Sequence, residues 1–215
     1  MTCILIIDDH PLYRSALRLA LEPAFDDVEI IEASSIDGLD RSNGKLRAVD
    51  LILLDLSLPG VNGLLALLLL RRQYPAVPVA IVSAVDDVPV IRRALACGAS
   101  GYITKKQPLN VVREAVGAIM DGEIWTPENV PSGDLASDTD IHHGFTELSP
   151  SEVRVLSLLC EGHVNAKMAE TLNIGEATVK AHVSAVLQKL GVSNRTHAVI
   201  MANQLTTREH VIGVL

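Results

Sequence analysis

Five polar residues follow short apolar runs in the first half of the chain: Asp8, Asp9, Asp55, Ser83 and Lys105. In an open parallel α/β sheet, ligands bind outside the carboxyl ends of the strands, so we expect these side chains to meet at one edge. Three adjacent carboxylates repel one another unless a cation lies among them, and Mg²⁺ prefers oxygen ligands of this kind. A hydroxyl and an ammonium group opposite them can hold the oxygens of a phosphoryl group in transfer. The pattern therefore predicts a phosphorylation site.

The elements that position these residues follow from the hydrophobic pattern. Short apolar runs predict five strands, at 4–7, 28–31, 51–54, 80–82 and 101–104. Patterns with helical spacing fall near 11–22, 35–45, 63–73, 87–97 and 108–121. Because strands alternate with helices, we expect an α/β fold with a doubly wound, parallel five-stranded sheet.

Several short motifs occur in order along this segment. They are IIDDH (6–10), LDLSLPG (54–60), Gly63, SA (83–84) and ACGASGYITK (96–105). Any one of them is a weak signal, but their order and their placement at strand ends together resemble the receiver domain of a two-component response regulator. The resemblance covers residues 1–121 and implies a flavodoxin-like fold with the strand order 2-1-3-4-5.

The resemblance also implies a role for each acidic residue. Asp55 would be the nucleophile that forms an aspartyl phosphate. Asp9, Asp55 and the backbone carbonyl of Ser57 would coordinate Mg²⁺, and Asp8 would act through a metal-bound water. The metal would neutralise charge on the entering phosphoryl group, so that an anion can be attacked by an anion.

Three further residues complete the site that the resemblance implies. Lys105 would pair with Asp55 before the reaction and with the phosphoryl oxygens afterwards. Ser83 would move to donate a hydrogen bond to the phosphoryl group, and Tyr102 would turn inward into the vacated space. That repacking would be the switch, because a change of charge biases an element with two states.

The chain changes character after Asp121. Residues 122–146 hold prolines, glycines, serines and 5 acidic residues without Lys or Arg, which is typical of a linker. Order is predicted to resume at Ser149, which with Pro150 and Glu152 makes a helix start with a reciprocal cap. We therefore expect a receiver at 1–121, an acidic linker at 122–146 and a second domain at 147–215.

The second domain is predicted to contain four helices. The first ends at Gly162, and the second, 166–172, can be capped by Asn165. The third covers 176–190 and is closed by Gly191, and the fourth runs from about 194 to 205. Two short helices joined by residues 173–175 describe a helix-turn-helix.

Three blocks in this domain, LSPSE (148–152), TVKAH (178–182) and KLGVSNRT (189–196), resemble the signature of the LuxR/NarL family. On the third helix the apolar positions have helical spacing and should be core: Val179, Val183, Val186, Leu187 and Leu190. Lys180, Ser184 and Gln188 lie four apart on the opposite face, where they are free to enter the major groove.

The resemblance assigns DNA contacts on this third helix. Lys180, Ala181 and Ser184 occupy positions that read bases. Thr178 and His182 are expected to contact phosphates or the wall of the groove.

The formal net charge of −8 at first argues against a protein that binds nucleic acid. The distribution of that charge removes the objection, because residues 1–121 carry 12 Lys and Arg against 15 Asp and Glu, and residues 122–146 carry none against 5. Residues 147–215 carry 6 of each sign and are neutral. We therefore expect each copy of the helix-turn-helix to bind DNA with low affinity.

The sequence predicts a location in the cytoplasm and no membrane partner. The longest apolar stretch, 64–70, is too short to span a bilayer, and no basic region precedes the apolar start at Cys3. Cys3, Cys97 and Cys160 are isolated and form no zinc motif among themselves.

These observations together predict a phosphorylation-activated transcriptional regulator. Its partners would be a sensor histidine kinase, double-stranded DNA and, when it is phosphorylated, a second copy of the chain. RNA polymerase is a further candidate partner. The chain would not be an enzyme beyond its own phosphoryl transfer and dephosphorylation.

Two alternatives stay open. A regulator that binds DNA independently of phosphorylation would have a silent receiver, which the complete set of acids and lysine disfavours. An aspartyl-phosphate phosphohydrolase would need a second catalytic Asp two residues after Asp55, to act as general acid, but Leu56 and Ser57 follow instead.

Overall fold

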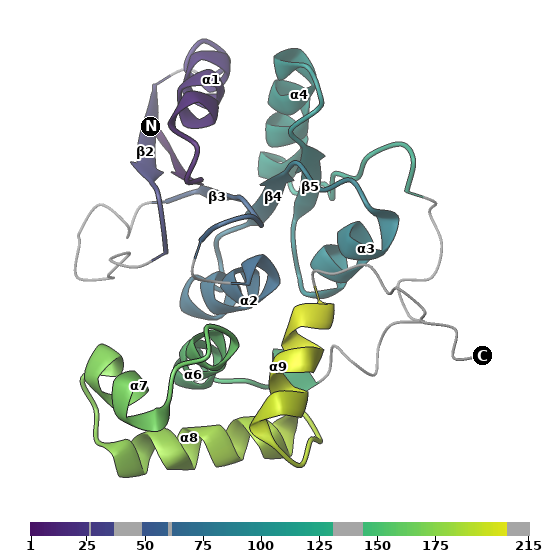
Figure 1. The fold of residues 1–215 in the computed structure, drawn as a ribbon. Helices are drawn as coiled ribbons and strands as arrows, with labels where there is room; N and C mark the ends of the chain where they lie inside the picture. The colour runs from purple at the N-terminus through teal and green to yellow at the C-terminus, as the bar shows by residue number, and fades with distance from the viewer. Residues whose placement is uncertain (26, 37–48, 60–61, 131–143, 206–215) are drawn as a thin grey trace.

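The computed structural model describes residues 1–25, 27–36, 49–59, 62–130 and 144–205. It contains a parallel sheet with the strand order β2-β1-β3-β4-β5 (Figure 1). The strands are β1 (Thr2–Ile7), β2 (Val28–Ala33), β3 (Leu51–Leu54), β4 (Val79–Ser83) and β5 (Gly101–Thr104). The predicted doubly wound sheet and its strand order are confirmed.

Helices cover both faces of this sheet (Figure 1). They are α1 (Pro11–Leu21), α2 (Gly63–Gln73), α3 (Val88–Ala96) and α4 (Leu109–Met120). α1 and α4 pack on one face, and α2 and α3 pack on the other. Because both faces are covered, a central strand can be apolar throughout, and every residue of β3 is buried. The helix predicted at 35–45 falls largely outside the described residues.

Helix α2 has no polar face along its first two turns, because residues 63–70, GLLALLLL, are all buried. Gly63 faces the rest of the N-terminal part, since a Cβ at that position would lie 2.4 Å from the backbone of Leu56. With about 3.6 residues per turn, Leu65, Leu68 and Leu69 then lie on the opposite face. We call these three leucines the outer face of α2. A helix that is apolar all round must be covered all round.

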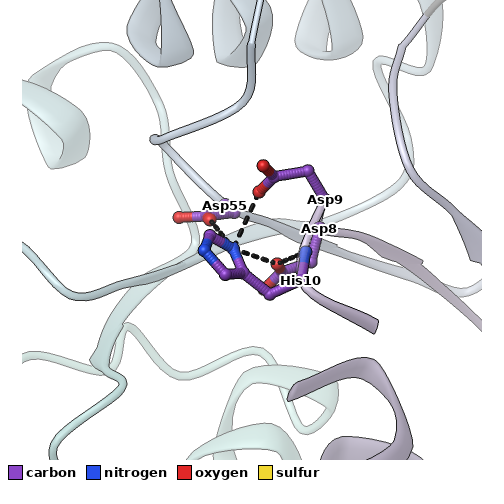
Figure 2. Close-up of side chains that lie close together, drawn as sticks. All are labelled: Asp8, Asp9, His10 and Asp55. Carbon is purple, nitrogen blue, oxygen red and sulfur yellow. Dashed lines mark hydrogen bonds and ion pairs between the residues drawn. The ribbon is translucent and has the colours of Figure 1, made fainter. Parts of the chain in front are cut away.

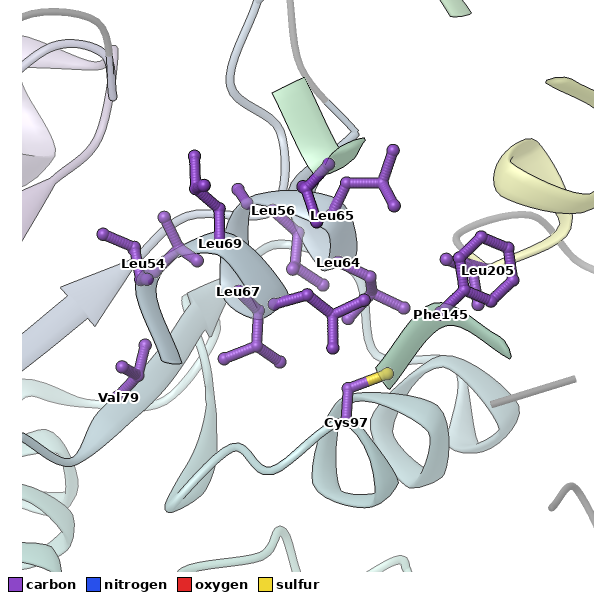
Figure 3. Packing of buried hydrophobic residues seen from close by; sticks show 14 of the residues in the cluster. Leu54, Leu56, Leu64, Leu65, Leu67, Leu69, Val79, Cys97, Phe145 and Leu205 are labelled. Carbon is purple, nitrogen blue, oxygen red and sulfur yellow. The ribbon is translucent and has the colours of Figure 1, made fainter. Parts of the chain in front are cut away.

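The C-terminal helices cover this outer face. They are α6 (Pro150–Cys160), α7 (Asn165–Leu172), α8 (Glu176–Lys189) and α9 (Arg195–Gln204). α6 packs against α2 and also contacts α8 and α9 (Figure 1). Leucines of α2 belong to one buried cluster with Cys97 from the N-terminal part and with Phe145 and Leu205 from the C-terminal part (Figure 3). The two parts therefore share a hydrophobic core.

Two polar contacts hold the end of α9 against the N-terminal part. Asn62 caps α2 with its side-chain oxygen, and its Nδ2 donates to the carbonyl of Ala202 at 2.8 Å. The guanidinium of Arg93 donates to the carbonyl of Gln204. Carbonyls in the last turn of a helix lack partners within the helix, so these donors satisfy groups that would otherwise need water.

The start of α6 carries the predicted reciprocal cap. Ser149 Oγ accepts the backbone N–H of Glu152, and the carboxylate of Glu152 accepts the backbone N–H of Ser149, so this prediction is confirmed. Burial raises the pKa of Glu152, but hydrogen bonds from Lys189 and Ser149 outweigh that effect and hold the pKa below its usual value. The cap therefore also joins α6 to the end of α8, where the Nζ of Lys189 lies 2.7 Å from Glu152 Oε2.

The other ends of the C-terminal helices depend on backbone conformation. Asn173 after α7 and Gly191 after α8 have left-handed φ angles of 52° and 67°, and the closure at Gly191 is as predicted. The prediction that Asn165 caps α7 is wrong, because Asn165 is the first helical residue. Val164 holds the cap position without a side-chain hydrogen bond. In the described part of the chain, no helix is long and apolar enough to cross a membrane.

The segment predicted as a linker begins in contact with the sheet. Gly101 and Trp125 form a short parallel bridge, and the backbone N–H of Tyr102 donates to the carbonyl of Trp125 at 2.8 Å. A Cβ at Gly101 would lie 2.6 Å from Cδ1 of Ile119, so a larger residue there would force the Ile119 side chain to shift. Residues 131–143 lie outside the described part of the chain, and Phe145, which follows them, is fully buried.

Candidate functional site

The strand register brings the predicted residues to one edge of the sheet. β1 and β3 pair up to their last residues, so Asp8 and Asp55, which follow them, are neighbours. The backbone N–H of Asp55 donates to the carbonyl of the last residue of β1 at 2.9 Å. Ser83 ends β4 opposite the last residue of β5, and Lys105 comes next. Asp9 follows Asp8 at the same edge, so the five residues gather as the sequence predicts.

Lys105 joins two buried carboxylates. Its Nζ lies 2.7 Å from Oδ2 of Asp55 and 2.7 Å from Oδ2 of Asp8. Asp8 and Asp55 are each 1% exposed, and a carboxylate buried to that degree needs a positive or hydrogen-bonding partner. The backbone N–H of Ser57 donates to Oδ1 of Asp55 at 3.1 Å, which fixes the orientation of this carboxylate.

Four residues at this edge could hold a metal ion. Asp8, Asp9, His10 and Asp55 each offer one ligand atom, and these atoms lie within 4.8 Å of one another (Figure 2). Oδ2 of Asp8 and Oδ1 of Asp9 are buried oxygens of this group. Lys105 Nζ lies 2.7 Å from the first and His10 Nδ1 lies 2.8 Å from the second, so both oxygens face positive or polar nitrogen atoms. Carboxylate oxygens of this kind fit Mg²⁺, which prefers hard oxygen ligands.

The side chains of Ser83 and Tyr102 both form a hydrogen bond with the backbone of Val85, in the loop after β4. Ser83 Oγ accepts the backbone N–H of Val85 at 3.2 Å, and the hydroxyl of Tyr102 donates to the carbonyl of Val85 at 2.8 Å. Both side chains are fully buried, and burial raises the pKa of Tyr102 far above its usual value. Tyr102 therefore already points inward, and a movement of Ser83 would have to break its contact with Val85.

Two residues that lie beside the carboxylates, His10 and Tyr13, have no role predicted from the sequence. His10 is part of the IIDDH motif, and its Nδ1 lies 2.8 Å from Oδ1 of Asp9. Tyr13 lies in the first turn of α1, with Lys105 Nζ 4.7 Å from the centre of its ring. Burial, with smaller contributions from Asp8 and Asp55, raises the pKa of Tyr13 to about 12. Adjacency to Asp9 was an available signal for His10, whereas an aromatic residue such as Tyr13 looks like any other core residue in a sequence.

The residues predicted to contact DNA lie on α8, on the side of the C-terminal helices that faces away from the sheet (Figure 1). The predicted core of this helix is confirmed by burial or by packing against the core: Val179, Val183, Val186, Leu187 and Leu190. On the other face Thr178, Lys180, Ala181 and Ser184 are exposed, and His182 is half-buried. The candidate contact face of α8 is therefore open to solvent.

Local contacts on α8 constrain its polar face only weakly. Lys180 Nζ lies 3.1 Å from Glu176 Oε1, one turn earlier, and both side chains are about half exposed. Exposed pairs of this kind contribute roughly 0–1 kcal/mol, so this one leaves Lys180 available to another anion. The hydroxyl of Ser184 donates to the carbonyl of Lys180 at 3.0 Å, as is common for serine inside a helix.

Two protein families match the chain, one in each half. Residues 4–117 match the response regulator receiver domain. Residues 146–202 match the bacterial regulatory proteins of the luxR family.

Individual relatives match over nearly the whole chain. A glycerol metabolism activator from Pseudomonas putida is 37% identical over 210 residues, which cover 94% of this chain and 95% of that protein. The nitrate/nitrite response regulator protein NarL from Escherichia coli strain K12 is 32% identical over 208 residues, with 94% of each chain covered. A structure of the RcsB response regulator from Salmonella typhimurium, described in terms of conformational dynamism for DNA interaction, has a TM-score of 0.55 at 25% identity, covering 94% of this chain and 98% of that one.

Proposed function

Since the chain belongs to the response regulators that join a receiver domain to a luxR-family DNA-binding domain, we propose that a phosphoryl group on Asp55 controls how it binds DNA. The family consists of transcription regulators of two-component systems and is not an enzyme family. The observation that carries the proposal is the contact of Lys105 Nζ with Oδ2 of Asp55, at 2.7 Å, beside two further carboxylates. The receiver would comprise residues 1–121 and the DNA-binding domain residues 147–215, joined by the linker at 122–146 in a protein of the cytoplasm.

In the proposed reaction, an oxygen of Asp55 attacks the phosphorus of a phosphohistidine on a sensor kinase. A new O–P bond forms as the P–N bond breaks, and the electron pair of that bond returns to the histidine nitrogen of the kinase. Lys105, already beside Asp55, keeps its ammonium group against the incoming phosphoryl oxygens. Asp9, Asp55 and the carbonyl of Ser57 would hold Mg²⁺, with Asp8 acting through water, and the bound ion would offset the negative charge that collects there.

The signal would leave the site through the loop after β4. A hydrogen bond from Ser83 to the phosphoryl group replaces its contact with Val85, and Tyr102 is tied to the same residue through the Val85 carbonyl. Phosphorylation of Asp55 would therefore affect the backbone of this loop through the side chains of Ser83 and Tyr102. A local change of charge would in this way be coupled to a change in side-chain packing.

DNA would be contacted by the open face of α8. Lys180, Ala181 and Ser184 would face the bases, and Thr178 and His182 would face phosphates or the groove wall. Residues 147–215 carry 6 positive and 6 negative side chains, so one domain gains little from counterion release and two must bind together. By resemblance to the LuxR/NarL family, we assign the contact between two phosphorylated copies to the fourth helix of the C-terminal domain, α9, and RNA polymerase is a candidate partner of the DNA-bound dimer.

Selection of bound oligonucleotides from a random pool, with and without acetyl phosphate and Mg²⁺, tests this function. With the phosphodonor, the enriched sequences should contain two half-sites spaced by about 10 base pairs or a multiple of that. Sedimentation of the same samples should show a larger dimer fraction after phosphorylation. Equal enrichment by an Asp55→Asn protein would instead identify a regulator that works without phosphorylation. Tight binding by strict monomers would contradict the proposed dimer.

Lys180→Ala is predicted to weaken binding to the best selected site by about 1–3 kcal/mol and to flatten the preference at one base pair. The physical reason is that a cation at this exposed position can bond to guanine O6 and N7 in the major groove. Binding isotherms on the selected duplex and on a scrambled duplex, at several salt concentrations, provide the measurement.

Two variants on the same helix serve as controls for Lys180→Ala. Glu176→Gln removes only the ion-pair partner of Lys180, so it should leave the base preference unchanged. Ser184→Lys adds a cation to the open face and should steepen the salt dependence by about one unit of slope. An equal loss of affinity on every duplex for Lys180→Ala would show that Lys180 contacts a phosphate and does not read a base.

A further inference from the structure

His10 occupies the cap position of α1 but does not act as a cap. Its backbone is extended there, and its side chain makes no capping hydrogen bond to the first turn of the helix. The backbone N–H of His10 instead donates to Oδ1 of Asp8 at 2.8 Å, which folds the residue back over the carboxylates. The imidazole ring consequently lies among Asp8, Asp9 and Asp55 (Figure 2).

The distances from one ring nitrogen of His10, Nδ1, to the carboxylate oxygens can be compared with those between ligands of a metal ion. Nδ1 of His10 lies 2.8 Å from Asp9 Oδ1, 3.2 Å from Asp8 Oδ1 and 3.9 Å from Asp55 Oδ2. In an octahedral site with bonds of about 2.1 Å, adjacent ligand atoms are ~3.0 Å apart and opposite ones ~4.2 Å apart. Asp9 and Asp55 are the two carboxylates expected to bind the ion directly, and the separations of Nδ1 from their oxygens lie close to the adjacent and the opposite value, respectively. The nitrogen is therefore spaced from these two oxygens as one ligand is spaced from another.

From this spacing we propose that His10 Nδ1 is a direct metal ligand. The site would then bind transition-metal ions with higher affinity than a site that has oxygen ligands alone. The proposal rests on the proposed function, because it takes the metal site of the phosphoacceptor as given. Imidazole nitrogen binds the later divalent metals, such as Co²⁺, more strongly than it binds Mg²⁺. The side chain of His10 is 62% exposed, so the ring can move by the small distance that coordination requires without disturbing the core.

Calorimetric titration of the full chain with Co²⁺ and with Mg²⁺, at one fixed pH, tests the selectivity. His10→Gln keeps a polar side chain of similar length but removes the nitrogen ligand. We expect it to lower Co²⁺ affinity by about tenfold or more, equivalent to about 1.4 kcal/mol, while Mg²⁺ affinity falls by less than about twofold. His163→Gln is the matched control, since His163 also lies beside a carboxylate, 2.9 Å from Glu161 Oε2, but far from the strand ends. Equal losses for both metals in His10→Gln, or no loss for Co²⁺, would overturn the proposal.

Pulsed electron paramagnetic resonance of bound Mn²⁺ identifies the ligand atom itself. The wild-type protein should show hyperfine coupling to an imidazole ¹⁴N, and His10→Gln should bind Mn²⁺ without it. Mn²⁺ bound to the wild type without nitrogen coupling would mean that the ring only pairs with the carboxylates, and the proposal would fail while the phosphorylation site stands. If Asp55→Asn binds every metal as well as the wild type does, the metal site of the proposed function is itself misplaced.

Discussion

Asp55→Asn is expected to abolish phosphorylation of the chain by acetyl phosphate and Mg²⁺. The carboxamide is a poor nucleophile, whereas the carboxylate of Asp55 is buried, oriented by the Ser57 N–H and placed 2.7 Å from Lys105 Nζ. Intact mass spectrometry before and after exposure to the donor should show one added phosphoryl group in the wild type and none in the variant.

Asp86→Asn is the matched control, because Asp86 is an exposed carboxylate near the same end of β4. It should be phosphorylated as fully as the wild type is. Asp9→Ala, by contrast, should lose the rate gain that Mg²⁺ gives, since a direct metal ligand is removed. An unchanged mass increase in Asp55→Asn would show that another residue is the nucleophile.

Leu65→Asp is expected to separate the two domains and to destabilise the chain by at least about 3 kcal/mol, because it places a charge where the side chain is fully buried. Leu65 lies on the outer face of α2, which α6 covers, so the change acts on the shared core. Two spectroscopic signals recorded during urea unfolding can report on the two domains in one experiment. Fluorescence of Trp125, the one tryptophan in the sequence, reports on the receiver, and far-ultraviolet circular dichroism also reports on the C-terminal helices.

The two signals should change together in the wild type, because a shared core makes the domains unfold as one unit. In Leu65→Asp they should separate into two transitions. Leu19→Asp is the control, since Leu19 is 71% exposed on α1 and its replacement should leave one coincident transition. Coincident transitions in Leu65→Asp, with an unchanged midpoint, would show that the outer face of α2 does not couple the domains.

The sheet and the acidic site could be predicted from the sequence because both depend on local patterns. A buried strand followed by a polar residue places that residue at the edge of a parallel sheet, and four such strands are enough to gather Asp8, Asp55, Ser83 and Lys105. The helix starts were predictable where a side chain makes the cap, as at Ser149. At Asn165 the prediction was one residue off, because the extended backbone of Val164 serves as the cap position without any side-chain signal.

The contact between the domains was not predicted, although the sequence contained a sign of it. The run at 64–70 is too short to cross a membrane, but its lack of a polar face also indicates a helix that is covered on every side. What covers it could not be known, since the partner helix α6 begins at Pro150, 77 residues after α2 ends at Gln73. The donors to the end of α9, Asn62 and Arg93, were hidden for the same reason, because a carbonyl group has no signature in a sequence.

The outer face of α2 also limits which DNA-binding domains can be joined to this receiver. This receiver presents Leu65, Leu68 and Leu69 to its own C-terminal domain. A chimera with a different output domain would leave these side chains in water, at a cost of roughly 1.5–3 kcal/mol for each leucine that loses its burial. A contiguous apolar patch of this kind also favours aggregation. The two domains therefore depend on each other for their burial. A working chimera that keeps this receiver would also have to keep the surface of α6 that faces it.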